Sequence, residues 1–218
     1  MPILVSFFPI PFMAFAIFQI PPSIEPSIIR RYIIFPISEN WFTFAHYLCP
    51  AMKQRILFVC LGNICRSPAA EGILRSLAER SGMAGEIEVD SAGTYGGHAG
   101  DLPDARMRRA AARRGYELTH RARRLRESDF EAFDMIVVMD DMNYEAAHRM
   151  APSRSEAAKI FRMVEFCPSF PDRSYVPDPY YEGHEGFELV LDMLEEGCRN
   201  ILERCREEAQ KSSPKLMQ

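Results

Sequence analysis

The sequence predicts an α/β fold, a three-layer sandwich in which helices cover both faces of a central four-stranded parallel sheet. Short apolar runs alternate with amphipathic segments from Met52 onward, a pattern typical of parallel strands joined by crossover helices. Apolar residues make up 47% of the 218 residues, enough for one sizeable core. We expect one domain at residues 52–210, followed by a tail at 211–218.

The expected strands are apolar runs of strand length that end at loops or polar segments. They lie at residues 54–60, 86–93, 133–140 and 159–166.

The expected helices alternate with these strands. They lie at residues 67–82, 103–115, 141–150 and 185–210. Gly82 ends the first, and Pro103 and Gly115 mark the two ends of the second. In the last helix the apolar side chains fall on one face, namely Phe187, Val190, Leu191, Leu194, Cys198, Ile201, Leu202 and Cys205.

The N-terminal residues 1–51 differ in composition from the rest. They hold eight of the sixteen prolines and carry no charged side chain before Glu25. A basic region typical of signal peptides is missing, and the uninterrupted apolar part is too short for a membrane span. We expect either that translation starts at Met52 or that this Pro-rich hydrophobic extension is real but disordered.

Charge and cysteine usage exclude several classes of protein. A net charge of −4 argues against nucleic-acid binding by the whole molecule. The six cysteines form no Cys-x-x-Cys pair, so no zinc site is expected. We expect a reducing, cytoplasmic compartment.

Nine arginines between Arg106 and Arg126 could form a basic patch, but we favour a solvated face balanced by carboxylates.

The first strand runs into Cys60-Leu61-Gly62-Asn63-Ile64-Cys65-Arg66-Ser67, and Pro68 then opens a helix. At such a strand-to-helix turn the free backbone N–H groups and the helix dipole form an anion cradle. Gly62 permits the sharp turn, and Arg66 can grip two phosphate oxygens. A cysteine at the floor of this cradle is favoured as a thiolate nucleophile. The alternative is a glycine-containing turn with two buried cysteines.

The segment CLGNICRSPAAEG (60–72) resembles the phosphate-binding loop of the low-molecular-weight protein tyrosine phosphatases. The likeness continues through SAGT (91–94), THRAR (119–123), FDMIVVMD (133–140) and VPDPYY (176–181). It implies a phosphotyrosine protein phosphatase I-like fold. It also implies hydrolysis of protein phosphotyrosine and small aryl phosphates through a cysteinyl-phosphate intermediate on Cys60.

The resemblance assigns roles to further residues. Asp178, between two prolines, matches the general acid that protonates the leaving oxygen and then activates water. Tyr180 and Tyr181 match one wall of a deep aromatic slot, with Leu61 and Ile64 at its floor rim. The other loop residues, Gly62, Asn63, Cys65 and Ser67, are expected to bind phosphate.

Supporting roles follow from the same resemblance. Asn63, Ser67, Ser91 and His120 match residues that hold the loop and supply a hydroxyl to the Cys60 thiolate. Cys65 matches a cysteine that traps the oxidised nucleophile as a reversible disulfide.

One position departs from the family pattern. Many relatives carry an aromatic residue shortly after SAGT, as the opposite wall of the slot, but here Gly97 occupies that position. Tyr95 is a candidate replacement.

Three alternative functions share parts of this pattern. An arsenate reductase of the same fold needs further redox cysteines, and none lies between Cys65 and Cys167. A phosphoarginine phosphatase resembles this chain but carries threonine at the position of Ile64. A catalytically inactive phosphopeptide-binding module is disfavoured because Cys60, Arg66 and Asp178 are all present.

The expected partner is a tyrosine-phosphorylated protein, with a tyrosine kinase of polysaccharide export as a further candidate. No metal or organic cofactor is expected, because Arg66 and the loop amides take the place of a cation. We expect no nucleic-acid partner and no membrane span, and a monomer or weak dimer.

Overall fold

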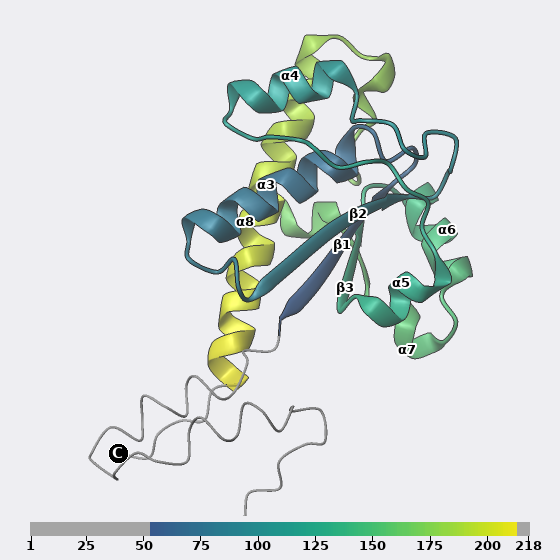
Figure 1. The fold of residues 1–218 in the computed structure, drawn as a ribbon, viewed down its shortest axis with the longest axis vertical. Coiled ribbons are helices and arrows are strands. Elements are labelled where there is room, and N and C mark those ends of the chain that lie inside the picture. Colours follow the sequence, from purple (N-terminus) through teal and green to yellow (C-terminus); the bar gives the residue numbers. More distant parts are fainter. Residues whose placement is uncertain (1–52, 213–218) are drawn as a thin grey trace, which may run out of the picture. The chain divides into compact units, whose positions relative to one another are not determined.

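A computed structural model of the chain describes residues 53–212 (Figure 1). Its core is a four-stranded parallel sheet in the order β2-β1-β3-β4. The strands are β1 Gln54–Cys60, β2 Ile87–Gly93, β3 Met135–Val138 and β4 Ile160–Arg162. The predicted α/β fold class is confirmed. The expectations for residues 1–51 fall outside the described residues, as does most of the expected tail.

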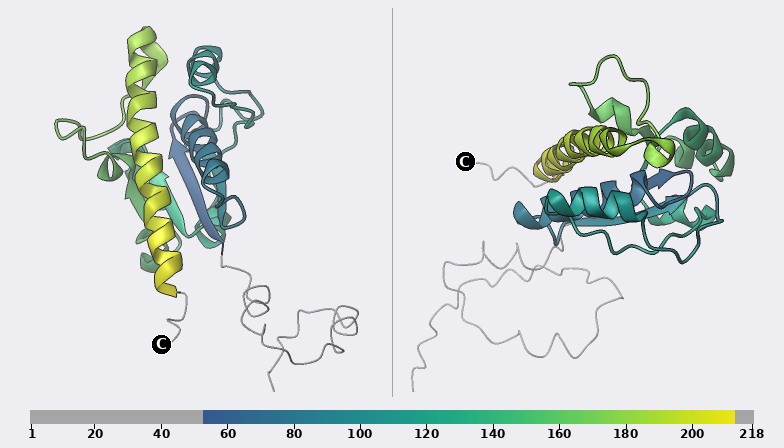
Figure 2. Two further views of the ribbon diagram at one scale, coloured as in Figure 1. Left: turned by 90° about the vertical axis from the view of Figure 1, so that its left-hand side faces the viewer. Right: turned by 90° about the horizontal axis from the view of Figure 1, so that it is seen from above.

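Six α-helices and two 3-10 helices complete the described part of the chain. They are α3 Arg66–Arg80, α4 Ala105–Arg113, α5 Glu127–Ala132, α6 Asp141–Met150, α7 Arg154–Ala157, α8 His184–Ser212, η1 Met163–Phe166 and η2 Pro179–Tyr181. In Figure 1, α3, α4 and α8 lie to one side of the strands and α5, α6 and α7 to the other. Figure 2 shows α8 extending along the length of the domain. None of these helices has the length and apolarity that a membrane span requires.

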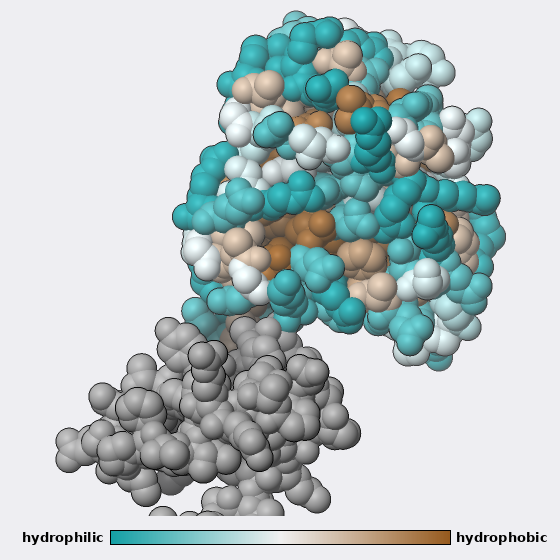
Figure 3. All heavy atoms as spheres, viewed as in Figure 1, coloured by the Kyte–Doolittle hydropathy of each residue, from teal (hydrophilic) through white to brown (hydrophobic). Residues whose placement is uncertain are grey.

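Alternate residues of β1 point into separate cores on the two faces of the sheet. Ile56 and Phe58 belong to the larger core, which contains the apolar face of α8. Leu57 and Val59 belong to the smaller core, together with Phe130 of α5. All four β1 side chains have no exposed surface, so β1 is a rigid support for whatever follows its last residue. The face of the described residues that Figure 3 shows is mostly hydrophilic, with smaller apolar patches between the polar side chains.

The fourth strand is shorter than predicted. The sequence analysis expected a strand over residues 159–166, but only Ile160–Arg162 is extended and Met163–Phe166 forms a 3-10 helix. Glu165 accepts a hydrogen bond from the Arg162 N–H and begins this turn. The turn lets Met163, which is fully buried, pack close to Gly197 of α8. Packing against α8 therefore overrides the apolar run that suggested a longer strand.

The short helices α5 and α7 were not predicted. Both are held by hydrogen bonds in their first turns. Asp129, the third residue of α5, accepts a hydrogen bond from the N–H of the N-cap residue Arg126 at 2.8 Å. Ser153, the N-cap residue of α7, accepts from the Glu156 N–H.

Candidate active site

Cys60 is the last residue of β1, and the loop that follows it bends back over its sulfur. The Sγ atom accepts a hydrogen bond from the Asn63 N–H at 3.2 Å and lies 3.0 Å from Ser67 Oγ. Cys65, at the N-cap of α3, provides no side-chain cap, so the first N–H groups of α3 are left for another acceptor. The loop and helix end together offer donors to an anion directly above the buried sulfur.

Arg66, the first residue of α3, is 3% exposed and is held from three sides. Its Nη1 donates to Asp140 Oδ2 at 2.7 Å and to the Val176 carbonyl at 3.1 Å, and its Nη2 donates to Asp178 Oδ2 at 3.1 Å. Burial opposes the charge, but Cys60 and the two carboxylates outweigh it and raise the guanidinium pKa above its usual value. The guanidinium is therefore fixed and permanently charged beside Cys60.

Asp140 connects a helix cap to Arg66. One carboxylate oxygen caps α6 by accepting from the Asn143 N–H at 2.7 Å, and the other oxygen binds Arg66. The contact with Arg66, 74 residues away in sequence, was not predicted.

Asp178 lies at the start of η2, with its carboxylate half-exposed. Its Oδ1 accepts from the Tyr180 N–H at 3.2 Å, while Oδ2 binds Arg66. The cap, Pro177 and Pro179 hold this carboxylate on the Arg66 side of the loop. The structure thus brings the predicted nucleophile, clamp and acid to one place, from two separate parts of the chain.

The side chain of Asn63 has a complete set of hydrogen bonds. Its Nδ2 donates to Ser67 Oγ and Ser91 Oγ, both at 2.9 Å. Its Oδ1 accepts from the Arg123 N–H at 2.8 Å and from His120 Nε2 at 3.1 Å. Asn63 also has a φ of 55°, in the left-handed region that asparagine tolerates better than most residues. This one buried amide therefore fixes the shape of the loop.

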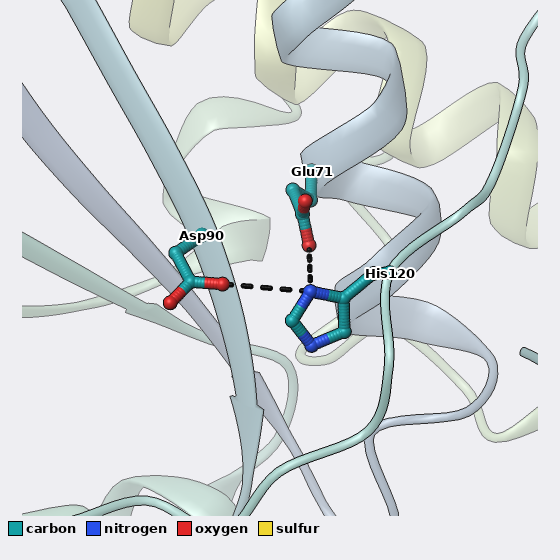
Figure 4. Close-up of side chains that lie close together, drawn as sticks. All are labelled: Glu71, Asp90 and His120. Atoms are coloured by element: carbon teal, nitrogen blue, oxygen red, sulfur yellow. Dashed lines mark ion pairs between the residues drawn. The ribbon is translucent and has the colours of Figure 1, made fainter. Parts of the chain in front are cut away.

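The side chain of His120 connects the loop to two carboxylates. The Arg123 N–H can only donate, so the Asn63 atom beside it is the oxygen, and His120 Nε2 must donate to that oxygen. His120 Nδ1 lies 3.0 Å from Glu71 Oε2 and 3.5 Å from Asp90 Oδ1, which are also acceptors (Figure 4). His120 therefore lies between the loop amide of Asn63 and the carboxylates of Glu71 and Asp90. Glu71, Asp90 and His120 are also close enough together to surround a metal ion.

Glu71 is the buried carboxylate of this cluster. Burial opposes its ionisation, but hydrogen bonds from His120 and Ser91, together with the charges of His120 and Arg75, outweigh burial. The pKa of Glu71 is consequently lower than usual. Ser91 Oγ donates to Glu71 Oε2 at 2.7 Å and accepts from Asn63, which connects this carboxylate to the loop.

We expect the substitution His120→Ala to lower the free energy of unfolding by about 3 kcal/mol at neutral pH, because the buried Glu71 then loses its pairing with His120 and keeps only the more exposed Arg75 as a cation. The loss should shrink as the pH falls through the lowered pKa of Glu71, since a protonated Glu71 needs no cation. Urea unfolding at several pH values measures both effects. His148→Ala, an exposed histidine on α6, is the control and should change stability little. An equal loss at all pH values would contradict the charge assignment.

The two tyrosines of the predicted aromatic wall differ in their exposure to solvent. The Tyr180 ring is 38% exposed and packs under the Arg106 guanidinium, whereas Tyr181 is 94% exposed. Leu61 is exposed at 44%, and Ile64 is half-buried. An exposed apolar rim therefore surrounds a buried polar floor.

Gly97 is explained by the ring of Tyr95. A Cβ atom at position 97 would lie 2.2 Å from Tyr95 Cε1, so no larger residue fits while that ring is in place. Tyr95 is exposed, and its N–H donates to the Leu61 carbonyl at 2.9 Å. The aromatic ring on this side of the loop thus comes from two residues earlier in the sequence than the family pattern led us to expect.

Several residues around the site were missed from the sequence. They are Glu71, Asp90, Arg106 and Arg123, all of which act through contacts distant in sequence. Only Glu71 carried a local signal, since it lies one helical turn after Ser67 on the face that leads away from the loop.

Comparison with known proteins gives consistent matches. The sequence model of the low molecular weight phosphotyrosine protein phosphatases matches residues 55–211. A low molecular weight protein-tyrosine-phosphatase from Streptomyces coelicolor is 40% identical over 160 residues, 73% of this chain and 98% of the relative. The Homo sapiens low molecular weight phosphotyrosine protein phosphatase is 37% identical over 152 residues, 69% of this chain and 95% of the relative. A crystal structure of a protein tyrosine phosphatase from Entamoeba histolytica has a TM-score of 0.69 at 41% identity, and the match covers 72% of this chain and 99% of that chain.

Proposed function

The chain belongs to the low molecular weight phosphotyrosine protein phosphatase family, a family of hydrolases, and we propose that it cleaves protein phosphotyrosine through a cysteinyl-phosphate intermediate on Cys60. One observation carries the proposal. The Cys60 sulfur, the Arg66 guanidinium and the Asp178 carboxylate converge on a loop whose free N–H groups are suited to an anion.

In the first step the Cys60 thiolate attacks phosphorus, and the bond from phosphorus to the tyrosine oxygen breaks. Asp178 protonates that oxygen, so the tyrosine leaves as a neutral phenol. Arg66 and the loop amides stabilise the charge on the equatorial oxygens of the transition state. The Ser67 hydroxyl, 3.0 Å from the sulfur, can donate to the thiolate and keep it ionised.

In the second step Asp178, now a carboxylate, takes a proton from water as the water attacks the phosphorus of the intermediate. The sulfur–phosphorus bond breaks, and Cys60 returns to the thiolate as phosphate leaves. Hydrolysis of p-nitrophenyl phosphate by reduced protein in the presence of EDTA tests this function. A folded protein without activity would rule it out and favour the phosphopeptide-binding module.

Tyr95 is proposed to form the second wall of the aromatic slot, opposite Tyr180. We expect Tyr95→Ala to raise KM for aryl phosphates about threefold to tenfold with a smaller change in kcat, because stacking on the substrate ring is lost. Alkyl phosphates, which have no ring to stack, serve as the matched comparison. An equal rise in KM for both substrate classes would contradict a wall role for Tyr95.

Cys65 is proposed to protect the nucleophile from irreversible oxidation. Burial is the main cause that raises the pKa of its thiol, so Cys65 is a neutral thiol at rest. Peroxide oxidises Cys60 to a sulfenic acid, and Cys65 then displaces water to form a disulfide. We expect reductant to restore most activity in the wild type after peroxide treatment but little in Cys65→Ser. Cys205→Ala, at a buried cysteine of α8, is the control and should recover as the wild type does.

A further inference from the structure

Two consecutive glycines shape the loop that follows β2. The Tyr95 ring lies over Gly97, and the side chain of Arg124 lies over Gly96, with its Cδ 3.3 Å from the position of a Cβ atom there. The hydrocarbon part of Arg124 is thus packed against the backbone, while the residue as a whole remains exposed. A guanidinium held by its stem in this way loses less conformational freedom when it binds a partner.

This loop lies against the anion-binding loop. The Thr94 and Tyr95 N–H groups donate to the carbonyls of Cys60 and Leu61, both at 2.9 Å. Gly93, which forms a bridge with Arg124, would place a Cβ atom 2.7 Å from the Leu61 carbonyl oxygen. The backbone of Gly93 therefore lies between Arg124 and Leu61 of the anion-binding loop.

A second arginine on the same segment is oriented by the loop. Arg121 Nη1 donates to the Gly100 carbonyl at 3.0 Å, and the Ala122 N–H donates to the Asp101 carbonyl at 2.9 Å. Arg121 is exposed, as is Arg124. Two exposed arginines therefore lie against the loop that carries Tyr95, one at Gly96 and one at Gly100.

These two arginines lack the partners that neutralise others in the arginine-rich stretch. Arg113 and Arg114 bind Glu188, and Arg123 binds Asp90 and Asp129. Within the described residues, no ion pair joins Arg121 or Arg124 to a carboxylate. The solvated, balanced face that we expected from the sequence thus accounts for part of the stretch and leaves a positive edge beside the mouth.

We propose that Arg121 and Arg124 bind an acidic side chain next to the phosphotyrosine of the protein substrate. This inference rests on the proposed phosphatase function and specifies its substrate class. The cradle holds only the phosphate and ring, so the residues on either side of phosphotyrosine must cross the rim. Asp178 lies on the Tyr180 side of the mouth, so an acidic neighbour is favoured on the Tyr95 side.

The test uses three phosphotyrosine peptides of equal length, in which the residues flanking phosphotyrosine are glutamate, glutamine or lysine. We expect kcat/KM to be about twofold to fivefold higher for the glutamate peptide than for the glutamine peptide, mainly through KM. The lysine peptide should be the poorest substrate. Raising the salt concentration to about 1 M, where the screening length is roughly 3 Å, should bring the three values together.

Arg124→Gln should lower the ratio of glutamate to glutamine peptide, and adding Arg121→Gln should bring it close to one. Arg199→Gln, which removes the same charge from an exposed position on α8, is the control and should leave the ratio unchanged. A ratio of one in wild-type protein, or a ratio that survives the double substitution, would overturn the inference. Hydrolysis of p-nitrophenyl phosphate by the wild type reports separately on the phosphatase function.

Discussion

Replacing Cys60 by serine is expected to abolish hydrolysis of p-nitrophenyl phosphate and phosphotyrosine peptides, with kcat lower by on the order of 10⁴-fold or more. A serine hydroxyl is a far weaker nucleophile at neutral pH, and the Ser67 hydroxyl and the Asn63 N–H do not supply a base to activate it. The serine Oγ can form hydrogen bonds with the Asn63 N–H and the Ser67 hydroxyl, as the sulfur does, so the variant should remain folded.

Steady-state kinetics in EDTA measure the loss, and thermal unfolding checks that the variant is folded. The variant should still bind a phosphotyrosine peptide, because Arg66 and the loop amides are unchanged. Cys205→Ala is again the matched control, with near wild-type activity. Residual activity of Cys60→Ser within tenfold of the wild type would rule out a cysteinyl-phosphate intermediate.

Replacing Asp178 by asparagine is expected to lower kcat for phosphotyrosine peptides by about 10²–10⁴-fold, the usual contribution of a general acid. The effect should be smaller for p-nitrophenyl phosphate, because p-nitrophenolate leaves readily without a proton. The substitution keeps an oxygen that can accept from the Tyr180 N–H, so η2 should remain capped.

The diagnostic measurement is the ratio of the two effects on kcat/KM, which does not include hydrolysis of the intermediate, the step that both substrates share. Asp172→Asn, at an exposed carboxylate in the preceding loop, is the control and should leave kcat/KM for both substrates unchanged. If Asp178→Asn lowered kcat/KM equally for both substrates, Asp178 would act by holding Arg66 and would not be the proton donor.

The parts of the fold that depend on local pattern were predicted correctly, and the resemblance to the phosphatase family is confirmed. The run QRILFVC and the one-sided apolar stripe of the last helix each specify an element through their own periodicity. The strand at 159–166 was wrong in its second half, because Met163 turns away to meet α8, a contact that no local pattern encodes.

In the candidate site, too, the residues that are contiguous in sequence were predictable and the contacts between distant residues were not. The loop from Cys60 to Ser67 is contiguous, so its residue types and spacing were enough to suggest an anion cradle. The contacts that hold it are not contiguous. Arg66 meets Asp140 and Val176 because β3 pairs with β1 and Val176 bonds to Met139. His120 likewise contacts Asn63, Glu71 and Asp90, which lie in other elements.

The contact between Arg66 and Asp178 has a consequence for affinity. Nη2 of Arg66 already binds the Asp178 carboxylate. A phosphate that binds to this nitrogen must therefore displace Asp178. Binding is then an exchange of one anion for another, and its free energy is the difference between two ion pairs. The same exchange assists the departure of inorganic phosphate, because Asp178 can return to Arg66 once it has released the proton that it took from water.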